Sequence, residues 1–180
     1  MIGMIEKVYA EALFQLGNEQ NTLDLFHEEL NAVRDVFEQN PDAVKFLSAP
    51  TIVYDDKMSF IDKIFKGKIC DDVFSFIKVL TKNKRISNIL TIADKFNADY
   101  NEFNNIIEIT VITVKPLKDE LKIKLKSKLE AMMNKSVKLI EKTDESIIGG
   151  IVLNYGNTMV DSSLKAQLDS LKIRMRSMIA

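Results

Sequence analysis

The sequence predicts an α+β protein, with an N-terminal six-helix bundle over residues 1–105 and a small C-terminal α/β domain over residues 106–180. Apolar residues recur at spacings of three and four through the first part, which is the periodicity of amphipathic helices. The period changes after Asn104-Asn105, where IIEITVITV alternates and is rich in β-branched residues. The chain has 180 residues, of which 46% are hydrophobic. Each part can therefore bury a core.

Three helices are predicted in the first 50 residues. Residues 5–16 and residues 23–37 each carry a single apolar stripe at helical spacing. A short helix follows Pro41 over residues 42–48 and ends before Pro50, because proline disfavours helical backbone in the residue before it.

Three further helices complete the predicted bundle. The acidic pairs Asp55-Asp56 and Asp71-Asp72 are expected to cap helices over residues 58–65 and 73–80. A sixth helix is predicted over residues 86–103. Short loops between these segments favour a compact bundle.

The C-terminal part is predicted to be a β-α-β-β-α unit. A strand over residues 106–114 is followed by a helix that starts at Lys115-Pro116. The apolar face of this helix is expected to consist of Leu117, Leu121, Leu125, Leu129 and Met132. Residues 136–142 are predicted as a second strand, and residues 149–161 as a hairpin about Gly156-Asn157.

A final helix is predicted after Ser162 or Ser163, either of which can cap it. Its narrow stripe repeats at spacings of four and three and consists of Leu164, Leu168, Leu171, Met175 and Met178.

Composition excludes several classes of site. One cysteine and one histidine exclude disulfides within the chain and zinc clusters that need several Cys and His ligands. No apolar run approaches the roughly 20 residues that cross a bilayer, so we expect a cytosolic protein without an anchor of its own. Residues 1–105 hold 12 basic against 17 acidic residues (−5), and residues 106–180 hold 13 against 9 (+4). The opposite signs suggest a different partner for each part.

Three of the six glycines, Gly149, Gly150 and Gly156, lie close together and could bind a phosphate or let the chain bend. A phosphate-binding loop needs Lys and Ser or Thr after its last glycine, but Asn157 follows Gly156. The pair Gly149-Gly150 leads into a predicted strand, whereas the dinucleotide motif leads into a helix. A bend or turn is the better interpretation.

The lysine-rich helix over residues 117–135 leaves one alternative open, a small phosphate- or RNA-binding protein that also uses the Gly149-Gly150 backbone. The segment contains no aromatic residue that could stack on a base, so a solvated helix face is favoured.

The order of features resembles the delta subunit family of the bacterial F-type ATP synthase, which is related to the oligomycin-sensitivity-conferring protein. The resemblance covers nearly the whole chain, from VYAEALFQL through FLSAPTI and FIKVLTKNKRI to the tail. Its most specific part is the tail pattern, which consists here of Asp144, Ser146, Gly149, Gly150, Asp161, Ser163 and Leu168. Weaker matches in the bundle are Tyr9-Ala10, Ala12, Asn83 and Arg85.

The resemblance implies a non-catalytic stator subunit, without cofactor or metal, that links the catalytic head to the peripheral stalk. Such a subunit resists rotor torque during proton- or sodium-driven ATP synthesis. It would lie at the cytoplasmic face of the cell membrane, held peripherally by the complex, and would bind neither nucleic acid nor the bilayer directly.

The resemblance also implies two contact regions. The first and fifth helices would form a groove for the N-terminal helix of an α subunit, and we expect there Tyr9, Ala12, Leu13, Val79 and Asn83. The C-terminal domain would meet the C-terminal helices of the b subunits, through Leu171, Met175 and Met178. The three glycines would be structural.

Overall fold

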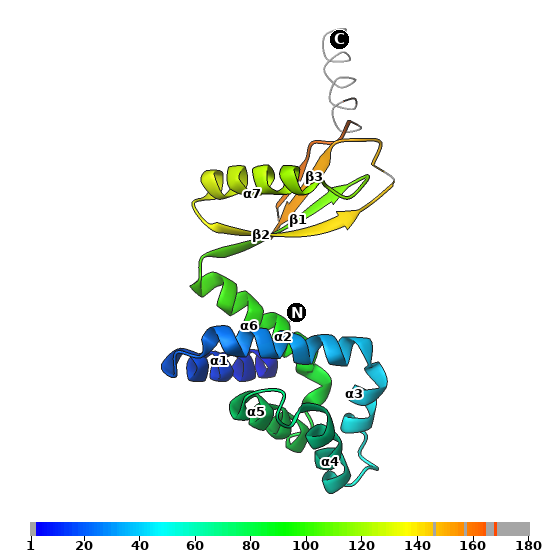
Figure 1. Cartoon of the computed structure of the whole chain (residues 1–180). Helices are drawn as coiled ribbons and strands as arrows, with labels where there is room; N and C mark the ends of the chain where they lie inside the picture. Colours follow the sequence, from blue (N-terminus) through cyan, green and yellow to red (C-terminus); the bar gives the residue numbers. More distant parts are fainter. Residues whose placement is uncertain (1–2, 146, 157, 165–167, 169–180) are drawn as a thin grey trace. The chain divides into compact units, whose positions relative to one another are not determined.

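The structure is a computed structural model that describes residues 3–145, 147–156, 158–164 and 168. The chain forms two compact units, which divide between Tyr100 and Asn101 (Figure 1). The first unit is helical, and the second contains a sheet with one long helix along it. The predicted α+β class, with helices first and a small sheet after them, is confirmed.

The first unit contains the six predicted α-helices. Pro41 starts the third helix, where its missing N–H group costs no hydrogen bond. Ile86, expected in the last helix, lies in a short 3-10 helix before it. The helices are α1 (Met4–Glu19), α2 (Leu23–Gln39), α3 (Pro41–Ser48), α4 (Tyr54–Phe65), α5 (Asp71–Lys82) and α6 (Ile89–Phe103), with the 3-10 helix η1 at Ile86–Asn88.

The predicted caps of α4 and α5 are wrong. Val53 and Cys70 occupy the N-cap positions, and neither side chain makes a capping hydrogen bond. Both acidic pairs lie within the first turn of their helices, where their charge complements the positive end of the helix dipole. At α5 the Cys70 N–H group donates to the Glu29 carboxylate of α2, at 2.9 Å from each oxygen.

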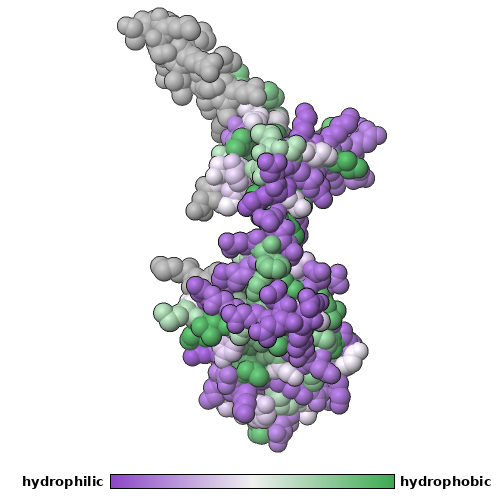
Figure 2. All heavy atoms as spheres, turned by 90° about the vertical axis from the view of Figure 1, so that its left-hand side faces the viewer, coloured by the Kyte–Doolittle hydropathy of each residue, from purple (hydrophilic) through white to green (hydrophobic). Residues whose placement is uncertain are grey.

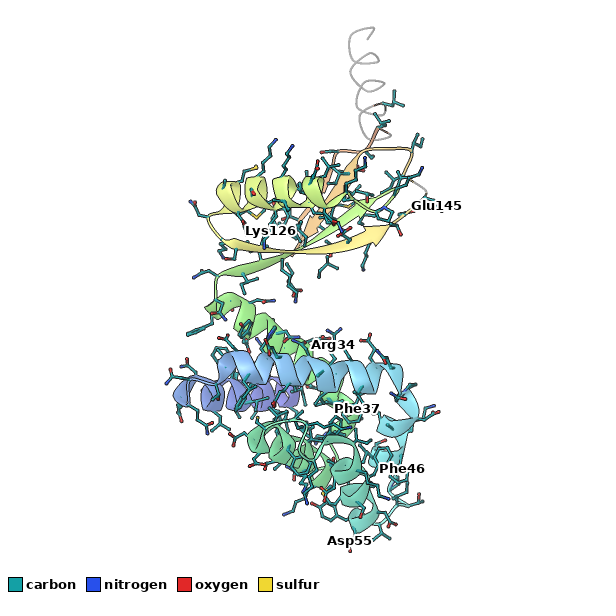
Figure 3. All side chains as sticks on the ribbon, in the orientation of Figure 1. Arg34, Phe37, Phe46, Asp55, Lys126 and Glu145 are labelled. Atoms are coloured by element: carbon teal, nitrogen blue, oxygen red, sulfur yellow. The ribbon has the colours of Figure 1, made fainter. Side chains whose placement is uncertain are left out.

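The core of the first unit combines residues from all six helices, because each helix buries one stripe. Phe37 of α2 points into this core, whereas Asp55 at the start of α4 is exposed (Figure 3). Aromatic pairs join distant helices: the ring centroids of Phe14 and Phe96 are 6.1 Å apart, and those of Phe37 and Phe65 are 5.6 Å apart. Such pairs add stability beyond the apolar area they bury.

The second unit is built on a four-stranded sheet with the strand order β2-β1-β3-β4. The strands are β1 (Ile106–Thr113), β2 (Ser136–Thr143), β3 (Ile151–Tyr155) and β4 (Thr158–Asp161), and the helix α7 (Asp119–Met133) connects β1 to β2. The pair β1-β2 is parallel, and β1-β3 and β3-β4 are antiparallel. Side chains of a strand alternate between the two faces of a sheet, so every second residue of β1 faces α7. Ile109 and Val111 are two of these residues, and both are buried.

The predicted apolar face of the helix after Pro116 is partly wrong. The helix begins at Asp119, so Leu117 precedes it. Leu125, Leu129 and Met133 pack against the sheet. The expected core residues Leu121 and Met132 are 51% and 81% exposed, because they lie on one flank of α7 instead of beneath it.

The final helix predicted after Ser163 lies almost entirely outside the described residues, and so do Leu171, Met175 and Met178. Within the part of the chain that is described, no helix is both long enough and apolar enough to span a membrane.

Candidate partner-binding surface

A surface formed by α1 and α5 brings together residues that are about 70 positions apart in the sequence. The Asn83 side-chain amide donates a hydrogen bond to the Tyr9 hydroxyl, with 2.9 Å between Nδ2 and Oη. The Tyr9 ring also packs edge-on against Phe76, at a centroid distance of 6.3 Å. These contacts hold the side chains of the two helices in place before any partner arrives, which lowers the entropic cost of binding.

Exposed apolar residues continue this surface along α1. Ile5, Val8 and Ala12 are all exposed and lie at spacings of three and four, so they share one outward flank of the helix. Val79 of α5 adds a side chain that is 45% exposed. Figure 2 shows apolar surface on this unit between polar regions. We define the α1–α5 surface as Ile5, Val8, Tyr9, Ala12, Phe76, Val79 and Asn83.

Four of the five residues predicted for the α-subunit contact lie on this surface, and one does not. Leu13 is only 2% exposed, because α1 turns it toward the core opposite Ala12. Phe76 was missing from the prediction, although it lies three residues before Val79 on the same flank of α5. Its helical spacing was the signal that could have indicated it.

The single cysteine and histidine have structural surroundings. Burial raises the pKa of the Cys70 thiol, and the nearby Glu29 carboxylate adds to this, so the reactive thiolate is disfavoured. The His27 ring stacks on Tyr100 with 4.0 Å between centroids. Among the described residues, no group of three or more His, Cys, Asp or Glu side chains could hold a metal ion.

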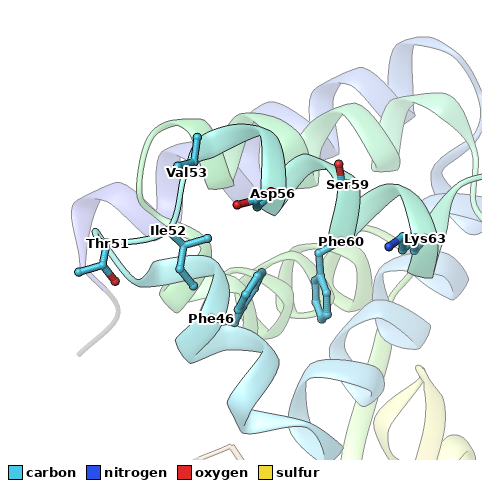
Figure 4. A pocket seen from close by; sticks show the side chains of 8 residues that line it. All are labelled: Phe46, Thr51, Ile52, Val53, Asp56, Ser59, Phe60 and Lys63. Carbon is cyan, nitrogen blue, oxygen red and sulfur yellow. The ribbon is translucent and has the colours of Figure 1, made fainter.

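A hollow of about 540 Å³ lies beside the start of α4 (Figure 4). Phe46 and Phe60 form its floor, with 5.0 Å between ring centroids, and its polar lining residues are Thr51, Asp56, Ser59 and Lys63. Within the described part of the chain, none of these four side chains hydrogen-bonds another.

The three glycines of the tail lie at bends. Gly150 has φ +92° and Gly156 has φ +54°, in the left-handed region that other residues avoid. Gly156 lies in the turn between β3 and β4, whereas Gly150 lies where the chain passes close to the Ser162 backbone. Gly149 leads directly to this contact, and its carbonyl accepts a hydrogen bond from the Leu164 N–H group at 2.9 Å.

Two lysines of the lysine-rich helix form ion pairs. Lys122 of α7 contacts Glu141 of β2 at 2.7 Å, and this hydrogen bond raises the pKa of Lys122. Lys126 lies 3.9 Å from Glu130 on the same helix. The Lys122–Glu141 pair fixes α7 to its own sheet, and the RNA-binding alternative is not favoured.

A helical unit with a pre-ordered apolar surface, followed by a small sheet unit, is the arrangement of a two-part binding protein. Residues 5–175 match the family model of the ATP synthase delta (OSCP) subunit. The chain belongs to this family, whose members are non-catalytic subunits of the ATP synthase, and it has a stator role.

Individual relatives agree over nearly the whole chain. It is 37% identical to the ATP synthase subunit delta of Lachnoclostridium phytofermentans, over 95% of this chain and 94% of the relative. It is 32% identical to the subunit delta of Clostridioides difficile, over the full length of both. A chain in the cryo-EM structure of the Toxoplasma gondii mitochondrial ATP synthase hexamer shares the fold, with a TM-score of 0.73 at 22% identity, covering 96% of this chain and 98% of that one.

Proposed function

We propose that the first unit binds the N-terminal helix of an α subunit of the catalytic head through the α1–α5 surface. The observation that carries this proposal is the row of exposed apolar residues on α1 beside Val79, joined by the hydrogen bond between Tyr9 and Asn83. An amphipathic helix buries its apolar face in such a surface through residues at helical spacing.

The second unit completes the link by binding the C-terminal helices of the b subunits in the peripheral stalk, through the predicted α/β domain over residues 106–180. The stripe of Leu171, Met175 and Met178 supports this part by its sequence pattern, because flexible methionines adapt to partner surfaces. The subunit is then held at the cytoplasmic face of the cell membrane by its partners. It catalyses no reaction and resists the torque of the rotor.

A substitution at Val79 tests the head contact. Val79→Asp places a carboxylate without a partner in the contact, which costs about 2–5 kcal/mol, or roughly 30-fold or more in affinity. The full-length chain is titrated calorimetrically with a peptide of the α-subunit N-terminus from the same organism. Val53→Asp is the matched control, because Val53 is also an exposed valine beside a helix but lies before α4.

The fold of both variants is checked by circular dichroism. Equal binding by folded Val79→Asp and Val53→Asp proteins would remove the α1–α5 surface from the proposal.

A further inference from the structure

The sheet of the second unit is wider than the helix that covers it. Adjacent strands lie about 4.8 Å apart, and a helix with its side chains is about 10 Å wide. A single helix therefore covers about two of the four strands. The contacts of α7 place it over β2 and β1. Lys122 pairs with Glu141 of β2, and Glu130 accepts a hydrogen bond from the Val137 N–H group of β2. Leu129 packs in one cluster with Ile109 and Val111 of β1. Figure 1 shows α7 along one face of the sheet.

The part of this face formed by β3 and β4 is apolar and incompletely covered. Leu153 pairs with the buried Val111 in the register of β1 and β3, so both side chains point to the α7 side. Tyr155 points the same way, because side chains alternate along a strand. Val160 of β4 pairs with Leu153 and is 41% exposed.

One flank of α7 borders this area. Leu121, Leu125 and Met132 follow each other at intervals of four and seven residues, which places them on one side of the helix. Glu130 lies half a turn around the helix from Leu121 and accepts the hydrogen bond from Val137 of β2, so the Leu121 flank faces away from β2, toward β3. We define the open shelf as Leu121, Leu125, Met132, Leu153, Tyr155 and Val160.

Lysines give the open shelf a positive border. Lys124 and Lys128 are exposed, lie one turn apart next to the Leu121 flank, and form no ion pair with any described residue. Residues 165–180 carry four basic residues and one acidic residue, a net charge of +3, which has the same sign as this border.

We infer that the open shelf binds one amphipathic helix of the peripheral stalk, with its apolar stripe on the shelf and a row of acidic residues against Lys124 and Lys128. This inference rests on the proposed stalk contact of the second unit and specifies a docking face and a charge pattern for it. A helix of about four turns matches α7, whose 15 residues span about 22 Å.

The test titrates the full-length chain with the soluble C-terminal part of the b subunit from the same organism. A double variant, Leu121→Glu with Met132→Glu, should bind at least 30-fold more weakly, since it places two carboxylates on the apolar shelf. The control is Ile123→Glu, because Ile123 is 67% exposed on the same helix but lies two residues from Leu121 and therefore off the shelf flank. It should bind within about twofold of the wild type.

A second double variant, Lys124→Glu with Lys128→Glu, examines the charge pattern. It should weaken binding about tenfold or more at low salt and much less in 1 M NaCl, where exposed charges are screened. Tighter binding by this variant would show that the occupant has a basic border and would overturn the inference.

The remaining outcomes separate the inference from the proposed function. Equal binding by the Leu121/Met132 variant and the Ile123 control would refute the open shelf and leave the stalk contact standing. If deletion of residues 165–180 alone abolishes binding, the contact belongs to Leu171, Met175 and Met178. If the wild-type chain does not bind the b subunit at all, the proposed stalk contact fails, and the inference fails with it.

Discussion

Replacing Gly150 by alanine is expected to destabilise the second unit severely. A Cβ atom at this position would lie 2.5 Å from the Ser162 carbonyl oxygen and 2.8 Å from the Ser163 Cα atom. These are backbone atoms, and they are held in place: the Ser162 N–H group donates to the Ile151 carbonyl, and the Leu164 N–H group donates to the Gly149 carbonyl, each at 2.9 Å. The neighbouring chain therefore cannot yield without breaking these two backbone hydrogen bonds.

Two costs add at Gly150. Its φ of +92° lies in the left-handed half of the backbone map, where a residue with a Cβ atom loses roughly 1–2 kcal/mol. The overlap with the Ser162-Ser163 backbone resembles an overpacked core, which costs about 1–3 kcal/mol. We expect Gly150→Ala to lower the free energy of unfolding of the second unit by roughly 3 kcal/mol.

Gly156→Ala is the matched control, because Gly156 also has a positive φ of +54° but nothing lies within 4 Å of a Cβ built there. It should cost only about 1 kcal/mol. The two units can unfold separately, so the measurement is hydrogen exchange of the β1 and β3 amides by NMR under native conditions. Equal losses of protection in the two variants would refute the role assigned to the close approach at Gly150.

Two further predictions concern the helical unit and the second core. The Tyr100 hydroxyl donates to the Asp24 carboxylate at 2.7 Å, and this bond, with a smaller effect of burial, raises the pKa of Tyr100 from 10.0 to about 12. The bond's contribution to stability is present below pH 10 and disappears as the pH rises through about 12. The phenolate absorbance of the wild type minus that of Tyr100→Phe should titrate near pH 12, and a midpoint near 10 would contradict the hydrogen bond. Leu129→Ala should lower the free energy of unfolding, measured by urea denaturation, by about 2–4 kcal/mol, because the Leu129 side chain is buried between α7 and the sheet. Leu121→Ala should lower it by less than about 1 kcal/mol, because Leu121 is half exposed. Similar losses at the two positions would show that Leu121 is part of the core.

The sequence alone determined the order of elements and the family. Helical spacing predicted α1 to α6, β-branched alternation predicted β1, and the Gly156 turn predicted the hairpin of β3 and β4. These signals are local: the period of an apolar pattern depends on backbone geometry, which is the same in every protein. The tail pattern around Gly149-Gly150 is likewise carried by neighbouring residues, so it could be recognised without a structure.

Only the tertiary structure decided which apolar side chains remain outside. Leu13 and Ala12 are adjacent in α1, yet Leu13 is buried and Ala12 is exposed, because the neighbouring helices cover only one side of α1. In α7 the same cause exposes Leu121 and Met132, since the sheet lies beneath Leu125 and Leu129.

The pairing of Tyr9 with Asn83 and the approach of Gly150 to Ser162 are also tertiary. A periodic stripe shows that a helix has an apolar side. How much of that side a neighbour covers depends on packing between segments far apart in the chain, and the uncovered remainder is what a partner can bind.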